Sequence, residues 1–266
     1  MQEDPSPTPP QFFLGREVDM YHVLNAILSK RLVTIVGETG VGRSSLVCAI
    51  CHYINERSST ILEFDRIFFV KTKQGRGGDR CRLLIQSLLD KLVEAGKSHP
   101  QQPDMDMEDL FDVICRALKN TKALIVFDRT ELFEGNDEAQ DFPLFLSNLF
   151  RETRNVRVML TCRRALGIPS IGGVVEQQYH LGPLNFANTV RLFANLCPHL
   201  HTPGERQNFF HQLVTDADMA DCLPTDPGIA CRTTLLFRKL GDGKPSGTEK
   251  AAYGMPAEEV RSLGRE

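Results

Sequence analysis

The segment Gly37–Ser44 reads GETGVGRS and directly follows a short apolar run, Leu32–Val36 (LVTIV). It matches the pattern G-x-x-x-x-G-K-[ST] at every fixed position except the lysine, where the chain has Arg43. The glycines let the backbone curl so that several N–H groups point inward at an anion, and a helix beginning near Ser44 adds its positive end. The order of strand, loop and helix favours a phosphate-binding loop over a simple glycine-rich turn.

Arg43 changes what this loop can do. A lysine here is a slim ammonium that fits between the β- and γ-phosphates, whereas a guanidinium is planar and bulkier. Arg43 can still neutralise phosphate charge, but it is not expected to reproduce the transition-state contacts of a lysine. We therefore expect nucleotide binding with slow or absent hydrolysis. The residues of this segment expected to contact the nucleotide are Gly37, Glu38, Thr39, Gly40, Val41, Gly42, Arg43, Ser44 and Ser45.

A carboxylate ends a second apolar run, Leu124–Asp128 (LIVFD). At the end of a buried strand beside a phosphate loop, Asp128 is placed to hold Mg²⁺ together with the Ser44 hydroxyl; the alternative is an ordinary strand-ending aspartate. Active ATPases of this type often carry a second acid at the next position, where this chain has Arg129. Glu131 is the nearest remaining carboxylate, and it either positions a catalytic water or is a solvated glutamate at a helix start.

A cation follows a further apolar run, Val156–Leu160 (VRVML). Arg163 would stand at the end of the strand next to that of Asp128, facing the γ-phosphate, where it could report which nucleotide is bound. On position alone, an exposed arginine at a strand end is the alternative.

The pattern of apolar segments predicts an α/β fold with a parallel sheet. Continuous apolar runs alternate with helical patterns, which is typical of a sheet covered by helices on both faces. The expected strands are 32–36, 67–70, 124–127 and 156–160, with a weaker fifth near 178–181. The expected helices between and after them are 44–54, 80–95, 107–118, 138–151, 186–196, 204–214 and 226–240.

Strand patterns stop after about Pro183, which predicts two parts. We expect a proline-rich disordered leader at 1–11, a three-layer nucleotide-binding α/β domain at 12–183, and a small all-helical lid at 184–266, with the nucleotide between the two folded parts. The chain ends soon after residue 245, so the expected module is a fragment of a longer protein, a truncated gene product or a stand-alone module.

Composition narrows the function classes. The chain has 266 residues, 24% of them charged, and a formal net charge of −3, which argues against disorder and against a nucleic-acid-coating protein. It lacks an apolar run of about 18 residues and a signal-peptide pattern, so a cytosolic or nuclear protein is expected, without a membrane partner. Cys48 and Cys51 form a C-x-x-C inside a predicted helix, which favours core packing over a redox or zinc site.

Taken together, these motifs resemble the STAND class of P-loop ATPases, especially NB-ARC and related AAA-like signalling modules, over residues 12–252. Phe12–Glu17 (FFLGRE) is similar to the F-x-G-R-E motif, which implies that Arg16 lies near the nucleotide. Thr161–Arg163 resembles the T-T-R sensor, whose arginine contacts the γ-phosphate. The other similar segments are Walker A at 37–44, Walker B at 124–128, the lid segment L-x-P-L…LF at 181–193, and G-x-P at 243–245, which implies that Pro245 packs near adenine.

The resemblance implies ATP/ADP and Mg²⁺ as ligands, and protein partners or self-association through further domains. Asp128, Glu131 and Arg163 are the implied catalytic residues. The expected function is a nucleotide-dependent switch. Two alternatives remain: a degenerate, non-hydrolysing interaction scaffold, favoured by Arg43 and Arg129, and an AAA-like DNA-associated ATPase, which the lack of net positive charge disfavours.

Overall fold

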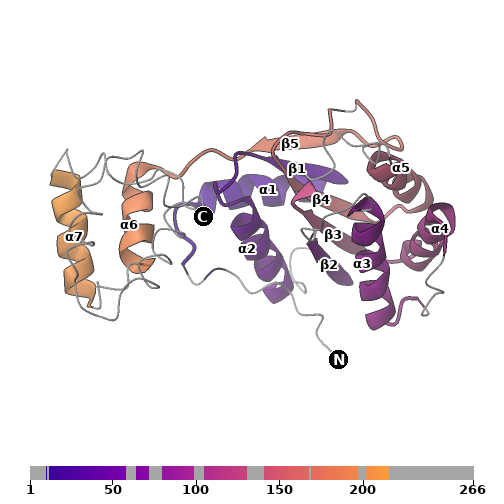
Figure 1. Ribbon diagram of the computed structural model, residues 1–266, viewed down its shortest axis with the longest axis horizontal. Coiled ribbons are helices and arrows are strands. Elements are labelled where there is room, and N and C mark those ends of the chain that lie inside the picture. Colours follow the sequence, from indigo (N-terminus) through magenta and orange to yellow (C-terminus); the bar gives the residue numbers. More distant parts are fainter. Residues whose placement is uncertain are drawn as a thin grey trace. The chain divides into compact units, whose positions relative to one another are not determined.

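The computed structural model of the chain describes residues 10, 12–57, 64–71, 80–98, 105–130, 141–167, 169–196 and 202–215. Helices and strands alternate along most of this part (Figure 1). In chain order they are α1 (Glu17–Ser29), β1 (Leu32–Val36), α2 (Arg43–Glu56), β2 (Arg66–Lys71), α3 (Arg80–Glu94), α4 (Met107–Leu118), β3 (Ala123–Asp128), α5 (Asp141–Glu152), β4 (Arg157–Cys162), β5 (Glu176–His180), α6 (Phe186–Leu196) and α7 (Pro203–Thr215).

The chain forms two compact units. The first comprises Asp19–Gly37 and Arg43–His180 and contains the whole sheet. The second comprises the described residues of Pro10–Val18, Glu38–Gly42 and 181–215. The domain limits predicted from the sequence stay predictions.

The first unit is built on a five-stranded sheet in the order β2-β3-β4-β1-β5, with every paired neighbour parallel. This confirms the predicted α/β, P-loop NTPase-like fold. Because parallel strands all end at the same edge of a sheet, the ends of β1, β3 and β4 meet there. Those ends carry, in turn, the phosphate loop, Asp128 and Thr161.

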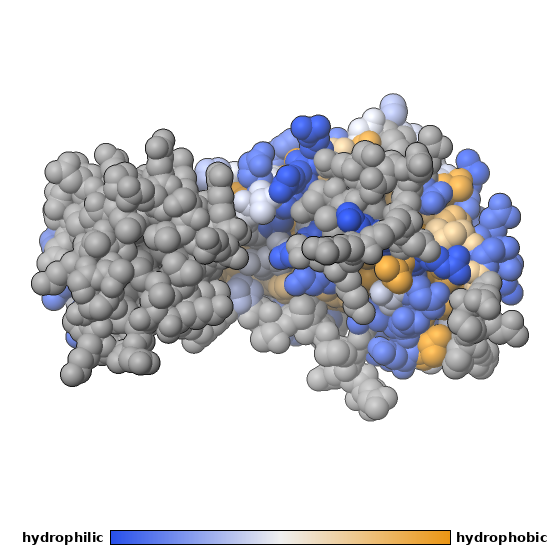
Figure 2. Space-filling view, viewed as in Figure 1, coloured by the Kyte–Doolittle hydropathy of each residue, from blue (hydrophilic) through white to orange (hydrophobic). Residues whose placement is uncertain are grey.

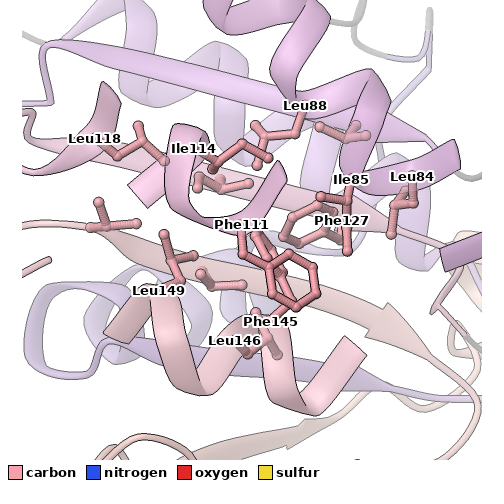
Figure 3. Packing of buried hydrophobic residues seen from close by; sticks show 14 of the residues in the cluster. Leu84, Ile85, Leu88, Phe111, Ile114, Leu118, Phe127, Phe145, Leu146 and Leu149 are labelled. Atoms are coloured by element: carbon pink, nitrogen blue, oxygen red, sulfur yellow. The ribbon is translucent and has the colours of Figure 1, made fainter. Parts of the chain in front are cut away.

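One face of the sheet is covered by α3, α4 and α5 (Figures 1 and 3). Their buried leucine, isoleucine and phenylalanine side chains pack against alternate residues of the strands, as the two-residue period of a strand requires. Phe111 and Phe145 lie with ring centroids 5.2 Å apart, and Phe127 meets Phe142 edge-on at 5.3 Å. Helix α4 begins at an N-cap, where the Asp106 side chain accepts from Asp109 N at 2.8 Å. Helices α1 and α2 lie on the opposite face.

Arg31, in the turn between α1 and β1, forms hydrogen bonds to the segment that connects α5 to β4. Its guanidinium donates to the carbonyls of Phe150 at 3.1 Å and Thr153 at 2.7 Å, and its Nε donates to Val156 O at 3.2 Å. The Phe150 carbonyl lies in the last turn of α5, where carbonyls lack intrahelical partners, and the same side chain also satisfies two carbonyls that follow the helix. Burial lowers the pKa of Arg31 from its ordinary value.

β5 is a polar edge strand with the sequence EQQYH, and its side chains are partly or fully exposed. Side chains attach it to its neighbours: Thr34 Oγ1 donates to Glu176 Oε1 at 2.5 Å, and Tyr179 OH donates to Asp19 Oδ1 at 2.6 Å. The sequence placed this strand near 178–181, two residues late at its start, because an exposed edge strand carries no apolar run.

Two helices with clear N-terminal caps lie in the second unit. Asn188 N donates to Asn185 Oδ1 at 2.9 Å just inside α6. Thr202 and Glu205 exchange hydrogen bonds at the start of α7, at 2.8 and 3.2 Å, which is a capping box. The helix predicted at 226–240 lies outside the described residues.

Figure 2 shows hydrophobic residues of the first unit as separate groups among hydrophilic ones on the visible face. Such scattered apolar side chains are ordinary on a protein surface. Within the described residues, none of the helices combines the length and the apolar character that crossing a membrane would take.

Candidate functional site

The phosphate loop connects β1 to α2 and requires its glycines. Gly40 and Gly42 have φ of 93° and 102°, a region that glycine adopts without strain. Gly37 N donates to Cys162 O at 3.3 Å, which ties the start of the loop to the end of β4. Gly40 and Gly42 thus adopt the backbone conformations that the predicted anion-binding turn would require.

The other loop residues differ in burial. Val41 and Arg43 are buried, whereas Gly40, Gly42 and Ser44 are half-buried. The remaining residues predicted to contact the nucleotide here, Glu38, Thr39 and Ser45, are exposed. Arg43 is the first residue of α2, at the helix end where backbone N–H groups and the dipole favour an anion.

Arg16 is a buried arginine whose side chain contacts the backbone of the loop. Its Nη2 donates to the carbonyls of Val41 and Gly182, each at 2.8 Å. The preceding Gly15 has φ of 66°, and a Cβ there would lie 2.0 Å from Asn188 Nδ2. The F-x-G-R-E segment, residues 38–42 of the phosphate loop and the chain leading into α6 therefore fit closely together within the second unit.

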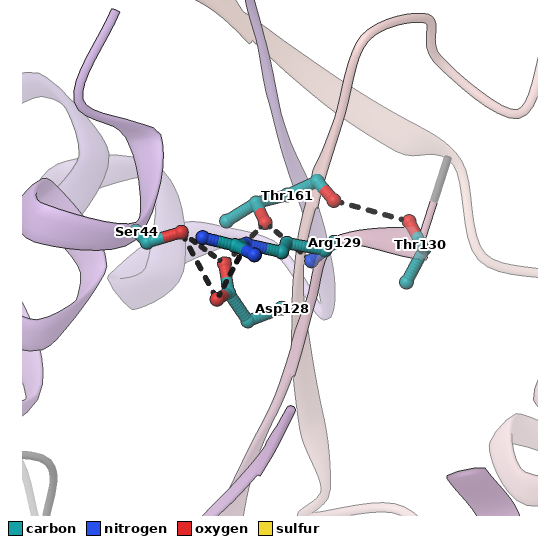
Figure 4. Close-up of polar contacts among 5 residues, drawn as sticks. All are labelled: Ser44, Asp128, Arg129, Thr130 and Thr161. Carbon is teal, nitrogen blue, oxygen red and sulfur yellow. Dashed lines mark hydrogen bonds and ion pairs between the residues drawn. The ribbon is translucent and has the colours of Figure 1, made fainter. Parts of the chain in front are cut away.

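Ser44, Asp128 and Thr161 come together at the end of the sheet (Figure 4). Ser44 Oγ donates to both carboxylate oxygens of Asp128, at 2.8 and 3.0 Å. Thr161 Oγ1 donates to Asp128 Oδ1 at 2.6 Å. Asp128 is 1% exposed. Burying a carboxylate is costly unless donors surround it, and these two hydroxyls are such donors. The sequence predicted the meeting of Ser44 and Asp128, but it did not assign Thr161 to the carboxylate.

Arg129 directly follows Asp128 and adopts a left-handed backbone, with φ of 68°. Its amide donates to Thr161 Oγ1 at 2.8 Å, so this hydroxyl both accepts from Arg129 and donates to Asp128. The Arg129 Nε lies 4.0 Å from Asp128 Oδ2. The sequence showed that an acid is replaced at this position, but not that the arginine side chain turns back to the carboxylate.

The remaining predicted residues are placed as follows. Arg163 is exposed directly after β4, at the same sheet edge as Asp128. Glu131 and Pro245 lie outside the described residues. In the described part of the chain, His, Cys, Asp and Glu form no cluster of three or more that could hold a metal ion.

The C-x-x-C pair lies inside α2, as predicted. Cys51 is buried and Cys48 is half-buried, and both are free thiols. Burial, with the charge of Asp128 nearby, raises the pKa of Cys48 to about 11 and raises that of Cys51 further still. Thiols held protonated in this way are poor nucleophiles and poor metal ligands, which supports core packing.

Comparison with known proteins identifies the family. A family model of the NACHT domain matches residues 31–199, which include the entire sheet, the phosphate loop and Asp128. Among curated proteins, none is similar enough in sequence to count as a match.

Solved structures share the fold. A STAND (signal transduction ATPase with numerous domains) protein with a tetratricopeptide repeat sensor from Pyrococcus horikoshii matches with a TM-score of 0.51 and 14% identity, over 98% of this chain and 43% of that chain. A Walker-type ATPase of Pyrococcus abyssi matches with a TM-score of 0.56 and 15% identity, over 96% of this chain and 73% of that chain. The ORC2 protein of Aeropyrum pernix, solved as ADPNP-ADP complexes, matches with a TM-score of 0.56 and 14% identity, over 98% of this chain and 70% of that chain.

At these identities the likeness concerns the fold alone, and the chain spans less than half of the length of the P. horikoshii protein. The family match is stronger, because it covers more than half of the chain. It also agrees with the phosphate loop on β1 and the carboxylate on β3. The resemblance to STAND-class ATPases is thereby confirmed, and the chain belongs to the NACHT domain family of P-loop NTPases, as a nucleotide-binding module.

Proposed function

We propose that this module is an ATP/ADP-dependent switch that hydrolyses ATP slowly or not at all. The observation that carries the proposal is Arg43, a residue that is 7% exposed at the first turn of α2, in the position of the phosphate-loop lysine. Nucleotide affinity in such a loop comes largely from backbone N–H groups, which the substitution leaves in place. Hydrolysis depends on charge stabilisation that develops only in the transition state, where a misplaced guanidinium contributes less.

The residues at the sheet edge suit Mg²⁺. Ser44 Oγ and the Asp128 carboxylate are within hydrogen-bond distance of each other, and oxygen is the ligand that Mg²⁺ prefers. Ser44 and Asp128 would hold the ion, which when bound would neutralise charge on the nucleotide phosphates. Arg163, exposed at the same edge, is proposed to contact the γ-phosphate.

A switch needs different affinities for ADP and ATP in two states, not fast turnover. The contacts of Arg16 support such a coupling within the second unit. One buried guanidinium donates to both the Val41 carbonyl in the phosphate loop and the Gly182 carbonyl before α6. A movement of the loop on nucleotide exchange would therefore break or strain a bond that also fixes the chain leading into α6.

The first test measures binding and turnover separately. We expect purified protein to release ADP on denaturation, and nucleotide-free protein to bind ADP and ATP in calorimetry. We expect turnover far below the ~10 s⁻¹ of a median enzyme. Protein that binds neither nucleotide would favour the interaction-scaffold alternative, and turnover near ~10 s⁻¹ would refute slow hydrolysis.

The second test replaces Arg43 by lysine. Arg43→Lys restores the slim ammonium, so we expect ATP turnover to rise by tenfold or more, on the order of one lost transition-state contact, while ADP affinity changes little. Arg43→Gln is the matched control, since it keeps a long polar side chain without the charge, and we expect it to weaken binding without raising turnover. Equal turnover in wild type and Arg43→Lys would show that Arg43 is not what limits hydrolysis.

A further inference from the structure

Arg129 is held in a strained backbone conformation at the sheet edge. Among the described residues it is the one non-glycine residue with positive φ, at 68°. Left-handed backbone crowds the Cβ of an ordinary residue and persists only where the surroundings enforce it. The enforcing contacts come from β4: Thr161 Oγ1 accepts from Arg129 N at 2.8 Å, and Thr161 O accepts from Thr130 Oγ1 at 3.2 Å. Strand β4 therefore fixes the direction in which the Arg129 side chain leaves the backbone.

That direction leads back to Asp128. Arg129 Nε lies 4.0 Å from Asp128 Oδ2, and the Arg129 side chain is 46% exposed while that of Asp128 is 1% exposed. In Figure 4 the guanidinium of Arg129 extends past the Asp128 carboxylate toward Ser44. A positive charge thus lies beside the carboxylate and the hydroxyl that are suited to a divalent cation.

We propose that the Arg129 guanidinium is a built-in counter-cation of the nucleotide site, which competes with Mg²⁺ for Asp128 and makes nucleotide binding nearly independent of divalent cations. This inference rests on the proposed function and specifies how its site is regulated. A cation already beside Asp128 repels a second one, because the Arg129 Nε lies 4.0 Å from a carboxylate oxygen that the second cation would need. Mg²⁺ sheds its hydration water reluctantly, so a carboxylate that is already paired attracts it weakly.

The same guanidinium can also neutralise charge on the nucleotide phosphates, as the ion would. It is half-exposed, so its donors are accessible from solvent, and planar guanidinium donors suit phosphate oxygens. The site would therefore keep its nucleotide when Mg²⁺ is removed. Arg129 acts here as a positioning and charge-supplying residue, and it is not assigned a step in hydrolysis.

The first experiment uses Mn²⁺ alone, as a paramagnetic substitute for Mg²⁺, on nucleotide-free protein. Free Mn²⁺ is followed by electron paramagnetic resonance during titration of wild type and Arg129→Gly. Glycine suits a φ of 68°, so this variant removes the charge and the strain without endangering the fold. We expect Arg129→Gly to bind Mn²⁺ about tenfold more tightly, as expected when one charge near a buried carboxylate is removed.

Two matched variants separate this effect from others. Arg129→Lys keeps a positive charge in the same backbone position, and Arg154→Gly removes an exposed arginine from the turn between α5 and β4. We expect both to bind Mn²⁺ as wild type does. A tenfold gain in either variant would overturn the inference, because the charge beside Asp128 would then not be the cause.

The second experiment measures ADP affinity in Mg²⁺ and in EDTA. We expect less than about a threefold difference in wild type and about tenfold or more in Arg129→Gly. Equal Mn²⁺ affinities in wild type and Arg129→Gly would overturn this inference even if ADP binds as proposed. A tenfold gain in Mn²⁺ affinity without any ADP binding would support the competition between Arg129 and divalent cations for Asp128, and it would overturn both the proposed function and the claim about nucleotide binding.

Discussion

Thr161→Val tests whether a single buried hydroxyl organises the site. Thr161 is 0% exposed, donates to Asp128 Oδ1 at 2.6 Å and accepts from Arg129 N at 2.8 Å. Valine has nearly the same shape, so the loss is one hydrogen bond to a buried carboxylate, about 1.5–3 kcal/mol, and the partner of one amide, about 1 kcal/mol. Better strand propensity and apolar burial return about 1 kcal/mol. The net expectation is a loss of about 1.5–3 kcal/mol of unfolding free energy.

Urea unfolding of the nucleotide-free protein measures this loss. With a slope of about 2–3 kcal/mol per molar, the midpoint should fall by about 1 M at an unchanged slope. Thr161→Ser keeps the hydroxyl and loses only a methyl group, so it should cost about 1 kcal/mol. A double-mutant cycle of Thr161→Val with Asp128→Asn should give a coupling of about 1 kcal/mol or more. Thr161→Val as stable as wild type, or Thr161→Ser less stable than Thr161→Val, would refute the role of the hydroxyl.

Two further predictions concern the first unit. Arg31→Met removes the guanidinium that donates to three carbonyls at the α5–β4 connection, so it should lower the unfolding free energy by about 3 kcal/mol. Arg31→Lys should lose about half as much. Equal urea midpoints in the wild type and both variants would contradict this prediction. Cys48 has its pKa raised to about 11, so its thiol should stay protonated and alkylate slowly in the native state at pH 8. Because unfolded Cys48 loses its proton first, near pH ~8.5, its contribution to stability should fall as the pH rises from there toward about 11. Rapid native-state labelling of Cys48 with iodoacetamide, mapped by mass spectrometry, would show the assignment to be mistaken.

The buried strands were predictable because each is a continuous apolar run. The run 32–36 is β1 as observed, and those at 67–70 and 124–127 fall one residue short at each end of β2 and β3. β5 was harder to locate, because it lies exposed at the sheet edge and its polar residues do not form the apolar run that marks a buried strand. The helical period similarly placed α4 and α6 at their observed bounds.

The sequence alone was enough to predict the phosphate loop and its chemistry, since the glycines, Arg43 and Ser44 are neighbours along the chain and their spacing sets how far apart they lie. It also predicted that Asp128 would come near Ser44, because the carboxyl ends of parallel strands share one edge. The order of the strands became known from the three-dimensional structure, which places Thr161 beside Asp128 and Arg129 in a left-handed backbone conformation. Contacts of this kind depend on strand pairing between residues more than thirty positions apart, and local residue preferences carry no information about such pairing.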